Sequence, residues 1–236
     1  MIQLSLIVPA YNEQERIAPT LRSYYDHILA SGIPFEIIVV DDGSNDGTVA
    51  TVNTLRTQMP QLSTMQLPAN KGKGNAVRQG MLAAKGNIVL FTDADGSTPA
   101  NQVDKLLAPL LTGKADVAIG SRYLGASQVT VAQPRMRIVW SRMVNKLVQK
   151  VLLPGILDTH CGFKAFTKAA AQQVFTKCSI DGWSFDLEAL AVARSLHLRI
   201  EEVPVTWAND ERSKGRLKQL PAELYSFYKI RKRLAV

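Results

Sequence analysis

The chain has 236 residues, of which 46% are hydrophobic, and it carries 28 Lys and Arg against 20 Asp and Glu. This composition places it among globular proteins. No apolar run reaches about 18 residues, which argues against a membrane-spanning helix, and the N-terminal MIQLSLIVPAYNE lacks the basic region and cleavage site of a signal peptide. Cys161 and Cys178 match no zinc spacing and no disulfide framework, so they suit a reducing cytoplasm.

Short, β-branched-rich apolar runs alternate with helical stretches through the first half of the chain. We predict strands at residues 4–8, 35–40, 88–91 and 117–119, with a weaker strand at 62–67. Helices are predicted at 15–29, 48–58, 75–84 and 99–111. Alternation at this spacing predicts an α/β fold whose mostly parallel central sheet has helices on both faces.

The second half is less regular. Its pattern predicts a long helix at 134–153, a short stretch at 161–166, a helix at 185–196, a strand at 199–205 and a polar loop at 207–215. No proline- or glycine-rich linker divides the halves, so we expect one domain at residues 1–210 followed by a basic C-terminal tail at 211–236.

The net charge of +8 belongs mostly to this tail. From Arg212 onward the chain has eight Lys or Arg and one acid, whereas the first 211 residues have 20 basic and 19 acidic groups. An amphipathic basic helix at 218–233 suits an anionic membrane surface. We therefore expect a cytoplasmic protein that binds the cytoplasmic face of a membrane peripherally. The alternative is a terminal helix packed on the core with solvated charges.

Carboxylates follow three of the predicted strands. Because ligands bind at the carboxyl ends of strands in open α/β sheets, these acids are expected to share one edge. Asp93 and Asp95 are one residue apart, so strand alternation would aim both the same way. A hard cation, Mg²⁺ or Mn²⁺, would offset their repulsion and leave positions for substrate phosphates. The alternative is an Asx-type turn in which Asp95 is a local acceptor.

Two further segments point to a phosphate-bearing nucleotide. Asp41, at the end of the predicted strand 35–40, is a candidate acceptor for a base or a ribose; the alternative is a turn and helix cap. Lys73 lies in Lys71-Gly72-Lys73-Gly74, which opens a helix as a phosphate cradle would. Its spacing is neither that of a dinucleotide fingerprint nor that of a Walker A loop, and a solvated loop is the plain alternative.

Taken in order, the motifs IVPAYNE, VVDDGSNDGT, NKGKGNAVRQG, FTDADG and GSRY resemble the family-2 glycosyltransferases of the GT-A nucleotide-sugar-binding fold. The later DTHCGFKAF and WSFDLEAL are similar to the branch that makes polyprenyl-phosphate sugars, especially the dolichyl-phosphate β-glucosyltransferases. The resemblance implies a metal-dependent, inverting transfer of a hexose, with glucose expected, to polyprenyl or dolichyl phosphate. The donor that the resemblance implies is a nucleotide diphosphate sugar, UDP-glucose or GDP-mannose. It also implies a donor pocket lined by Pro9, Ala10, Tyr11, Asn12, Glu13, Asp41, Lys73, Asp93, Ala94 and Asp95.

The remaining candidates concern the acceptor. A sugar hydroxyl needs a carboxylate base, for which Asp186 is a candidate, and Asp158 is a candidate for supporting the metal or the sugar. A phosphate monoester needs cations rather than a base, because it is already ionised near neutrality. Arg122, with Arg212 and Lys214, is our candidate for binding an acceptor phosphate. A capped helix start for Asp186 and solvated surface for the arginines are the alternatives.

Three other functions compete with this interpretation. A nucleotidyltransferase would need a glycine-rich, Arg-containing loop after the first strand, where the chain has Pro9–Glu13. Nucleic acid is not expected as a partner, because the aromatic–basic interleaving of a stacking platform is missing. A glycosyltransferase with a saccharide or other hydroxyl acceptor, and a different donor sugar, remains the closest alternative.

Overall fold

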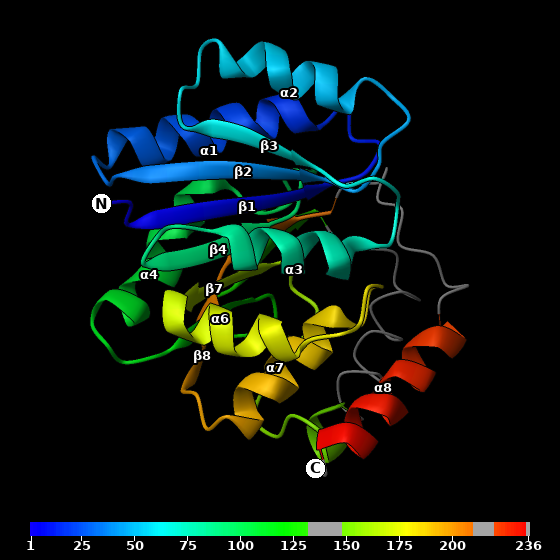
Figure 1. The fold of residues 1–236 in the computed structure, drawn as a ribbon. Coiled ribbons are helices and arrows are strands. Elements are labelled where there is room, and N and C mark those ends of the chain that lie inside the picture. Colours follow the sequence, from blue (N-terminus) through cyan, green and yellow to red (C-terminus); the bar gives the residue numbers. More distant parts are fainter. Residues whose placement is uncertain (132–147, 210–219, 235–236) are drawn as a thin grey trace.

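The computed structural model describes residues 1–131, 148–209 and 220–234 (Figure 1). A seven-stranded sheet runs through its centre in the order β3-β2-β1-β4-β7-β5-β8. All strands are parallel except β7, which pairs antiparallel with both β4 and β5. The strands are β1 Leu4–Ala10, β2 Phe35–Asp41, β3 Leu62–Gln66, β4 Ile88–Thr92, β5 Val117–Ser121, β7 Phe163–Thr167 and β8 Ile200–Pro204. A separate pair joins β6 Gln128–Val131 to β9 Thr206–Ala208.

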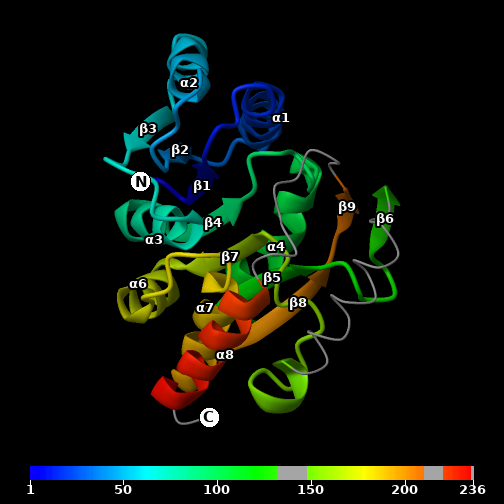
Figure 2. The ribbon, with the colours of Figure 1, turned by 90° about the vertical axis from the view of Figure 1, so that its right-hand side faces the viewer.

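Helices cover both faces of the sheet (Figures 1 and 2). The first face carries α1 Ile17–Ala30, α2 Thr48–Arg56 and α4 Val103–Leu111, the last preceded by a 3-10 turn at Ala100–Gln102. The second face carries α3 Lys73–Ala83, α6 Lys168–Lys177 and α7 Phe185–Ser195, and α8 Leu220–Leu234 packs on α7. The predicted α/β fold with a mostly parallel sheet is confirmed.

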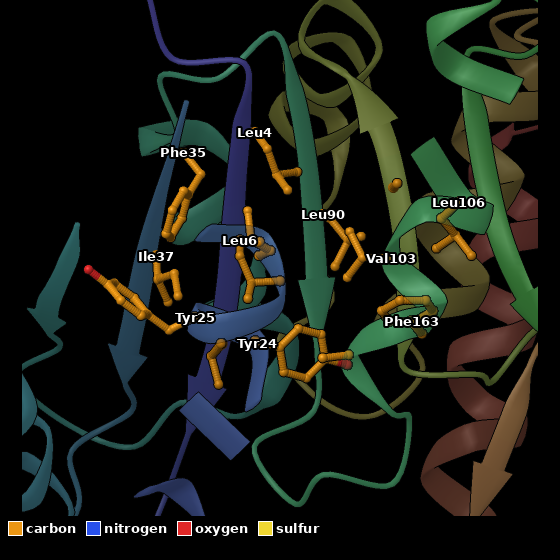
Figure 3. Packing of buried hydrophobic residues seen from close by; sticks show 14 of the residues in the cluster. Leu4, Leu6, Tyr24, Tyr25, Phe35, Ile37, Leu90, Val103, Leu106 and Phe163 are labelled. Atoms are coloured by element: carbon orange, nitrogen blue, oxygen red, sulfur yellow. The ribbon is translucent and has the colours of Figure 1, made fainter. Parts of the chain in front are cut away.

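Alternation along the strands builds the two cores. On β1, Leu4 and Leu6 belong to the apolar cluster under α1, whereas Ile7 belongs to the cluster under α3. Figure 3 shows Leu4, Leu6 and Leu90 packed with Tyr24 of α1. Because both faces are covered, most residues of the central parallel strands are apolar, and these strands read as short, nearly continuous apolar runs.

The second half departs from prediction in three places. The stretch predicted at 161–166 is strand β7, which is inserted antiparallel between β4 and β5. Helix α6 was not predicted, and the predicted loop at 207–215 begins inside β9. Of the predicted helix at 134–153, residues 134–147 lie outside the described residues, and 148–151 are helical. No helix in the described part of the chain is long and apolar enough to cross a membrane.

Candidate active site

A pocket of about 400 Å³ opens at the carboxyl edge of the sheet. It is built from the residues that follow β1, β2 and β4, together with the start of α3 and one residue before α7. Of the predicted donor residues, eight line it: Pro9, Ala10, Tyr11, Glu13, Lys73, Asp93, Ala94 and Asp95. Sequence reasoning missed Arg16, Asp42, Asn70, Gly72, Ala76 and Trp183, which line it too.

Helix α1 fixes the turn that carries the two central acids. The Thr20 hydroxyl donates to the Ala94 carbonyl at 3.0 Å, and the Tyr24 hydroxyl donates to the Thr98 carbonyl at 2.8 Å. Strand β4 ends at Thr92, so Asp93 and Asp95 belong to a turn and not to a strand. Strand alternation was therefore the wrong reason for placing them together, although both carboxylates do line the same pocket.

The sequence left open whether Asp95 would be a cation ligand or the local acceptor of an Asx-type turn, and its position is compatible with both. Its Oδ1 accepts a hydrogen bond from the Ser97 amide at 3.0 Å, as an Asx-type turn requires. Its Oδ2 lies 4.0 Å from the Arg16 guanidinium. Burial, and then the neighbouring Asp93, raise the pKa of Asp95. The local turn thus holds a carboxylate whose ionised form is disfavoured.

Asp93 has a counter-ion of its own. The Lys73 ammonium forms a salt bridge with its Oδ1 and lies 5.3 Å from the centre of the Trp183 ring. Burial alone would lower the pKa of Lys73, but the negative charges of Asp93, Asp186 and Asp95 outweigh it and raise that pKa. In the free chain, the lysine that was predicted to bind phosphate is therefore paired with Asp93, the carboxylate beside which a phosphate would bind.

The chemistry of the pocket fits a divalent cation. Its lining has four acids, Glu13, Asp42, Asp93 and Asp95, and two bases, Arg16 and Lys73, which leaves a formal charge of −2. No group of three or more His, Cys, Asp or Glu within the described ranges is arranged to hold a metal. Asp93 and Asp95 would therefore supply two ligands and leave the remaining positions to water and substrate phosphates, as Mg²⁺ prefers.

The exit of β2 shapes the opposite wall. The carboxylate of Asp42 accepts hydrogen bonds from the amides of Lys71 and Gly72, at 3.1 and 2.7 Å, and so ties the loop before α3 to the sheet. Asp41 lies outside the lining; its Oδ2 accepts the Ser44 amide at 3.1 Å, whereas its buried Oδ1 has no hydrogen-bond partner among the described residues. The role predicted for Asp41 toward a base or ribose stays a prediction.

Asn12 lies at the same edge but does not line the pocket. It adopts a φ of 55°, and its side-chain oxygen accepts the Asn45 amide at 2.9 Å. Its own amide donates to the Ser44 hydroxyl at 2.9 Å. Asn12 therefore joins the turns that follow β1 and β2, and direct contact with a donor remains a prediction.

Asp158 and Arg122 form a buried pair beside the pocket rather than in its lining. The Arg122 guanidinium donates to both carboxylate oxygens, at 2.7 and 2.9 Å, and the Arg122 amide donates to Oδ2 at 3.0 Å. Burial alone would raise the pKa of Asp158, but Arg122 lowers it overall. Arg122 thus has a partner within the protein, and its role toward an acceptor phosphate stays a prediction, as does a metal or sugar role for Asp158.

Asp186 is also paired inside the protein. Its Oδ1 accepts a hydrogen bond from the ammonium of Lys164, a fully buried residue of β7, at 2.5 Å. Two residues on, Glu188 accepts the amides of Ser179 and Ile180 and pairs with Arg233 of α8. Neither acid lines the pocket. Arg212 and Lys214, the other candidates for an acceptor phosphate, lie outside the described residues.

Comparisons with known proteins give the family of the chain. The sequence model described as "Glycosyl transferase family 2" matches residues 5–175, which include every lining residue except Trp183. The chain belongs to this glycosyltransferase family. This family-2 glycosyltransferase is 38% identical over 230 residues to the dolichyl-phosphate beta-glucosyltransferase of Drosophila melanogaster, covering 90% of the chain and 69% of the relative. The Saccharomyces cerevisiae relative of the same name is 34% identical, with the same coverage.

Among solved structures, this glycosyltransferase is similar to glucosyl-3-phosphoglycerate synthase from Mycobacterium tuberculosis, crystallised with Mn²⁺, uridine diphosphate and phosphoglyceric acid. The TM-score is 0.74 at 20% identity, and the match covers 100% of this chain and 79% of that one. A crystal of the same synthase with Mg²⁺ and uridine diphosphate gives a TM-score of 0.73 at 19% identity. At such identities the likeness bears on the fold, and the predicted GT-A fold is confirmed.

Proposed function

We propose that this family-2 glycosyltransferase transfers glucose from UDP-glucose to a polyprenyl phosphate such as dolichyl phosphate, with inversion and with a bound Mg²⁺ or Mn²⁺. The relatives named dolichyl-phosphate beta-glucosyltransferase support the reaction class, because they match about 90% of the chain. The pocket at the carboxyl edge supports the donor side, since it offers two carboxylates and a lysine where a metal-bound diphosphate would lie.

Asp93 and Asp95 would hold the cation. When bound, it supplies Lewis-acid stabilisation of the charge that develops on the departing diphosphate. Lys73 carries a positive charge beside the same carboxylates, so it is placed to bind that diphosphate as well. The loop at 70–72, held by Asp42, orients the start of α3 toward the pocket. These residues would bind and orient the donor.

The observation that carries the acceptor assignment is the state of the candidate bases. Asp158 is paired with Arg122, and Asp186 is paired with Lys164. A carboxylate held by a buried cation is a weak base toward a sugar hydroxyl. A phosphate monoester has a second pKa of about 6 and is largely ionised at neutral pH without help. An acceptor that needs no base therefore suits this site best.

The alternative, transfer to a saccharide hydroxyl, keeps the donor pocket and differs only in the acceptor. One experiment separates the two. Purified enzyme is incubated with UDP-glucose or GDP-mannose, with Mn²⁺, Mg²⁺ or EDTA, and with a short polyprenyl phosphate, the matching polyprenol or a saccharide. We expect a metal-dependent glucosyl product with the phosphate alone. Transfer to the saccharide but not to the polyprenyl phosphate would refute the proposal.

Helix α8 packs on the core with exposed basic residues, as the alternative interpretation of the tail expected, and those residues could in addition bind a membrane surface peripherally. Ile230 anchors α8 in the core, whereas Tyr228 is 60% exposed and Arg231 and Lys232 point to solvent. Basic residues near an anionic bilayer contribute about 1 kcal/mol each. The double variant Arg231→Gln/Lys232→Gln should therefore bind phosphatidylserine-containing vesicles about tenfold or more weakly in a flotation assay.

The matched control, Lys85→Gln/Lys114→Gln, removes two exposed lysines near the amino ends of β4 and β5. It should bind these vesicles like the unmodified chain. Equal binding by all three proteins would contradict the role of α8. Such binding is expected at the cytoplasmic face of a membrane, where anionic lipids and nucleotide sugars are both available.

A further inference from the structure

Lys164 is an unexpected residue for the middle of a sheet. It lies on β7, directly between Phe91 of β4 and Ile119 of β5, and its side chain is fully buried. A buried ammonium loses its hydration, and an apolar side chain of similar length would avoid that cost. A lysine at this position therefore calls for a reason beyond the packing of the core.

Its ammonium joins two segments that are separate in sequence. It donates to the Cys161 carbonyl at 2.6 Å and to Asp186 Oδ1 at 2.5 Å, and it lies 5.6 Å from the centre of the Phe91 ring. The first contact holds the turn that leads into β7. The second holds the first turn of α7. Both segments reach the donor pocket through the residues next to these contacts.

The turn before β7 reaches the pocket through Gly162, which follows Cys161. Its backbone lies so close to Asp93 that a Cβ on Gly162 would be 2.2 Å from Asp93 Oδ2. The start of α7 lies next to Lys73 of the pocket through Phe185, whose ring centre is 5.8 Å from the Lys73 ammonium and 5.7 Å from the ring centre of Phe91. Asp93 and Lys73 thus lie against the two segments that Lys164 ties together.

We infer that Lys164 is a positioning residue for the donor site: by holding the Cys161 carbonyl and Asp186 together, it fixes the surfaces on which Asp93 and Lys73 rest. It contacts neither donor nor acceptor and acts through these two residues. The inference rests on the proposed function, because it takes Asp93 and Lys73 to bind a metal-bound diphosphate. The same inference assigns Asp186 a structural role, as the partner of Lys164, instead of the role of a base.

The test compares Lys164→Met with Lys168→Met as a matched control. Lys168 also donates to a backbone carbonyl, that of Ala84 at 3.0 Å, but it lies at the start of α6 away from the pocket lining. For each variant, binding of uridine diphosphate with Mn²⁺ is measured by calorimetry. Thermal unfolding, and kcat and KM for UDP-glucose, are measured on the same preparations. Residues that orient metal ligands typically contribute about 10- to 100-fold to affinity. We expect a loss of that size for Lys164→Met and less than about twofold for Lys168→Met.

A second variant covers the case in which Lys164→Met does not fold. Gly162→Ala leaves the contacts of Lys164 in place and pushes only the end of the Asp93 side chain, so it should fold and yet bind uridine diphosphate with Mn²⁺ at least about tenfold more weakly. Lys164→Arg keeps the charge and should recover part of the affinity lost in Lys164→Met.

The outcomes separate the inference from the function on which it rests. If the unmodified chain binds no uridine diphosphate with Mn²⁺ and transfers no glucose, the proposed function fails. If the unmodified chain binds and turns over, but folded Lys164→Met matches it in Kd and in kcat/KM, the positioning role is overturned and the function stands. Wild-type affinity in Gly162→Ala would overturn it as well.

Discussion

Replacing Asp95 by Asn tests the electrostatics of the pocket directly. In the folded chain, burial and Asp93 hold the pKa of Asp95 above its ordinary value of 3.8. A carboxyl group whose pKa is raised on folding binds more protons in the folded state, so stability falls as pH rises from about 4 through the raised pKa. At pH 7, without metal, Asp95→Asn should therefore be more stable than the unmodified chain.

Metal reverses this order. A ligand at 100 times its Kd stabilises the folded state by about 2.7 kcal/mol. For a chain of this size each kcal/mol corresponds to about 2–4 °C in Tm, so Mn²⁺ with uridine diphosphate should raise the Tm of the unmodified chain by about 5–10 °C. Asp95→Asn removes one of the two carboxylates that would hold the cation. It should lose most of that rise, and kcat should fall by about 100-fold or more.

The assay is thermal unfolding at pH 7 in EDTA and in Mn²⁺ with uridine diphosphate, with turnover measured on the same preparations. Asp104→Asn serves as the control, because Asp104 is 59% exposed and pairs with His27 away from the pocket. It should follow the unmodified chain in both buffers. An Asp95→Asn variant that is less stable than the unmodified chain in EDTA, or that gains as much from Mn²⁺, would refute the reasoning.

Two further predictions concern stability. Arg122→Ala leaves Asp158 buried without its counter-ion, so the free energy of unfolding at pH 7, measured in urea, should fall by about 3–5 kcal/mol, whereas Arg199→Ala, in an exposed pair, should change it little. Because the pKa of Asp158 is lowered on folding, the Arg122–Asp158 pair should contribute to the free energy of unfolding above about pH 4, and this contribution should be lost at lower pH. If Arg122→Ala leaves stability unchanged and only raises KM for the acceptor, Arg122 would instead be a phosphate-binding residue. Gly80→Ala on α3 places a Cβ 2.4 Å from Ile7 on β1, and should cost about 1–3 kcal/mol despite the better helix propensity of Ala; an unchanged urea midpoint would contradict that close packing.

The parallel part of the fold was accessible from the sequence because its strands are buried on both faces. Such strands read as uninterrupted apolar runs, and helices of matching length separate them. Strand β7 was missed because Lys164 interrupts its apolar pattern. Its antiparallel insertion depends on pairing with Phe91 and Ile119, which are distant in sequence.

Helix α6 was missed although the sequence does contain its pattern. Thr167 accepts the Ala170 amide as an N-cap, and Ala170, Ala171, Val174 and Phe175 recur at helical spacing and are buried. The alanines at 169–171 carry little apolar surface, so the helical spacing of the apolar residues is weak at the start of α6. A cap followed by one apolar face would have been enough to identify it.

The acids at the strand ends could be predicted, but their partners could not. A strand-end rule uses only local sequence, so it places Asp93 and Asp95 at one edge without saying what neutralises them. Lys73 comes from the first turn of α3 and Trp183 from the segment before α7, and only the tertiary structure brings them together. Local sequence therefore identifies the acids, whereas tertiary pairing decides what each acid does.

Pairing sorts the acids into two groups with different chemistry. Asp158 and Asp186 have their charge balanced by the buried cations of Arg122 and Lys164, and Arg122 lowers the pKa of Asp158. Among the described residues, Asp95 interacts with Ser97, with the charge of Lys73 and with a guanidinium 4.0 Å away, but burial and Asp93 outweigh these contacts and raise its pKa. A divalent cation bound by Asp93 and Asp95 would stabilise the ionised form of Asp95. Without a cation the lining carries a formal charge of −2, so it would repel a diphosphate. Under the proposed function, the burial that makes the ionised form of Asp95 unfavourable in the free chain would also make donor binding depend on the metal.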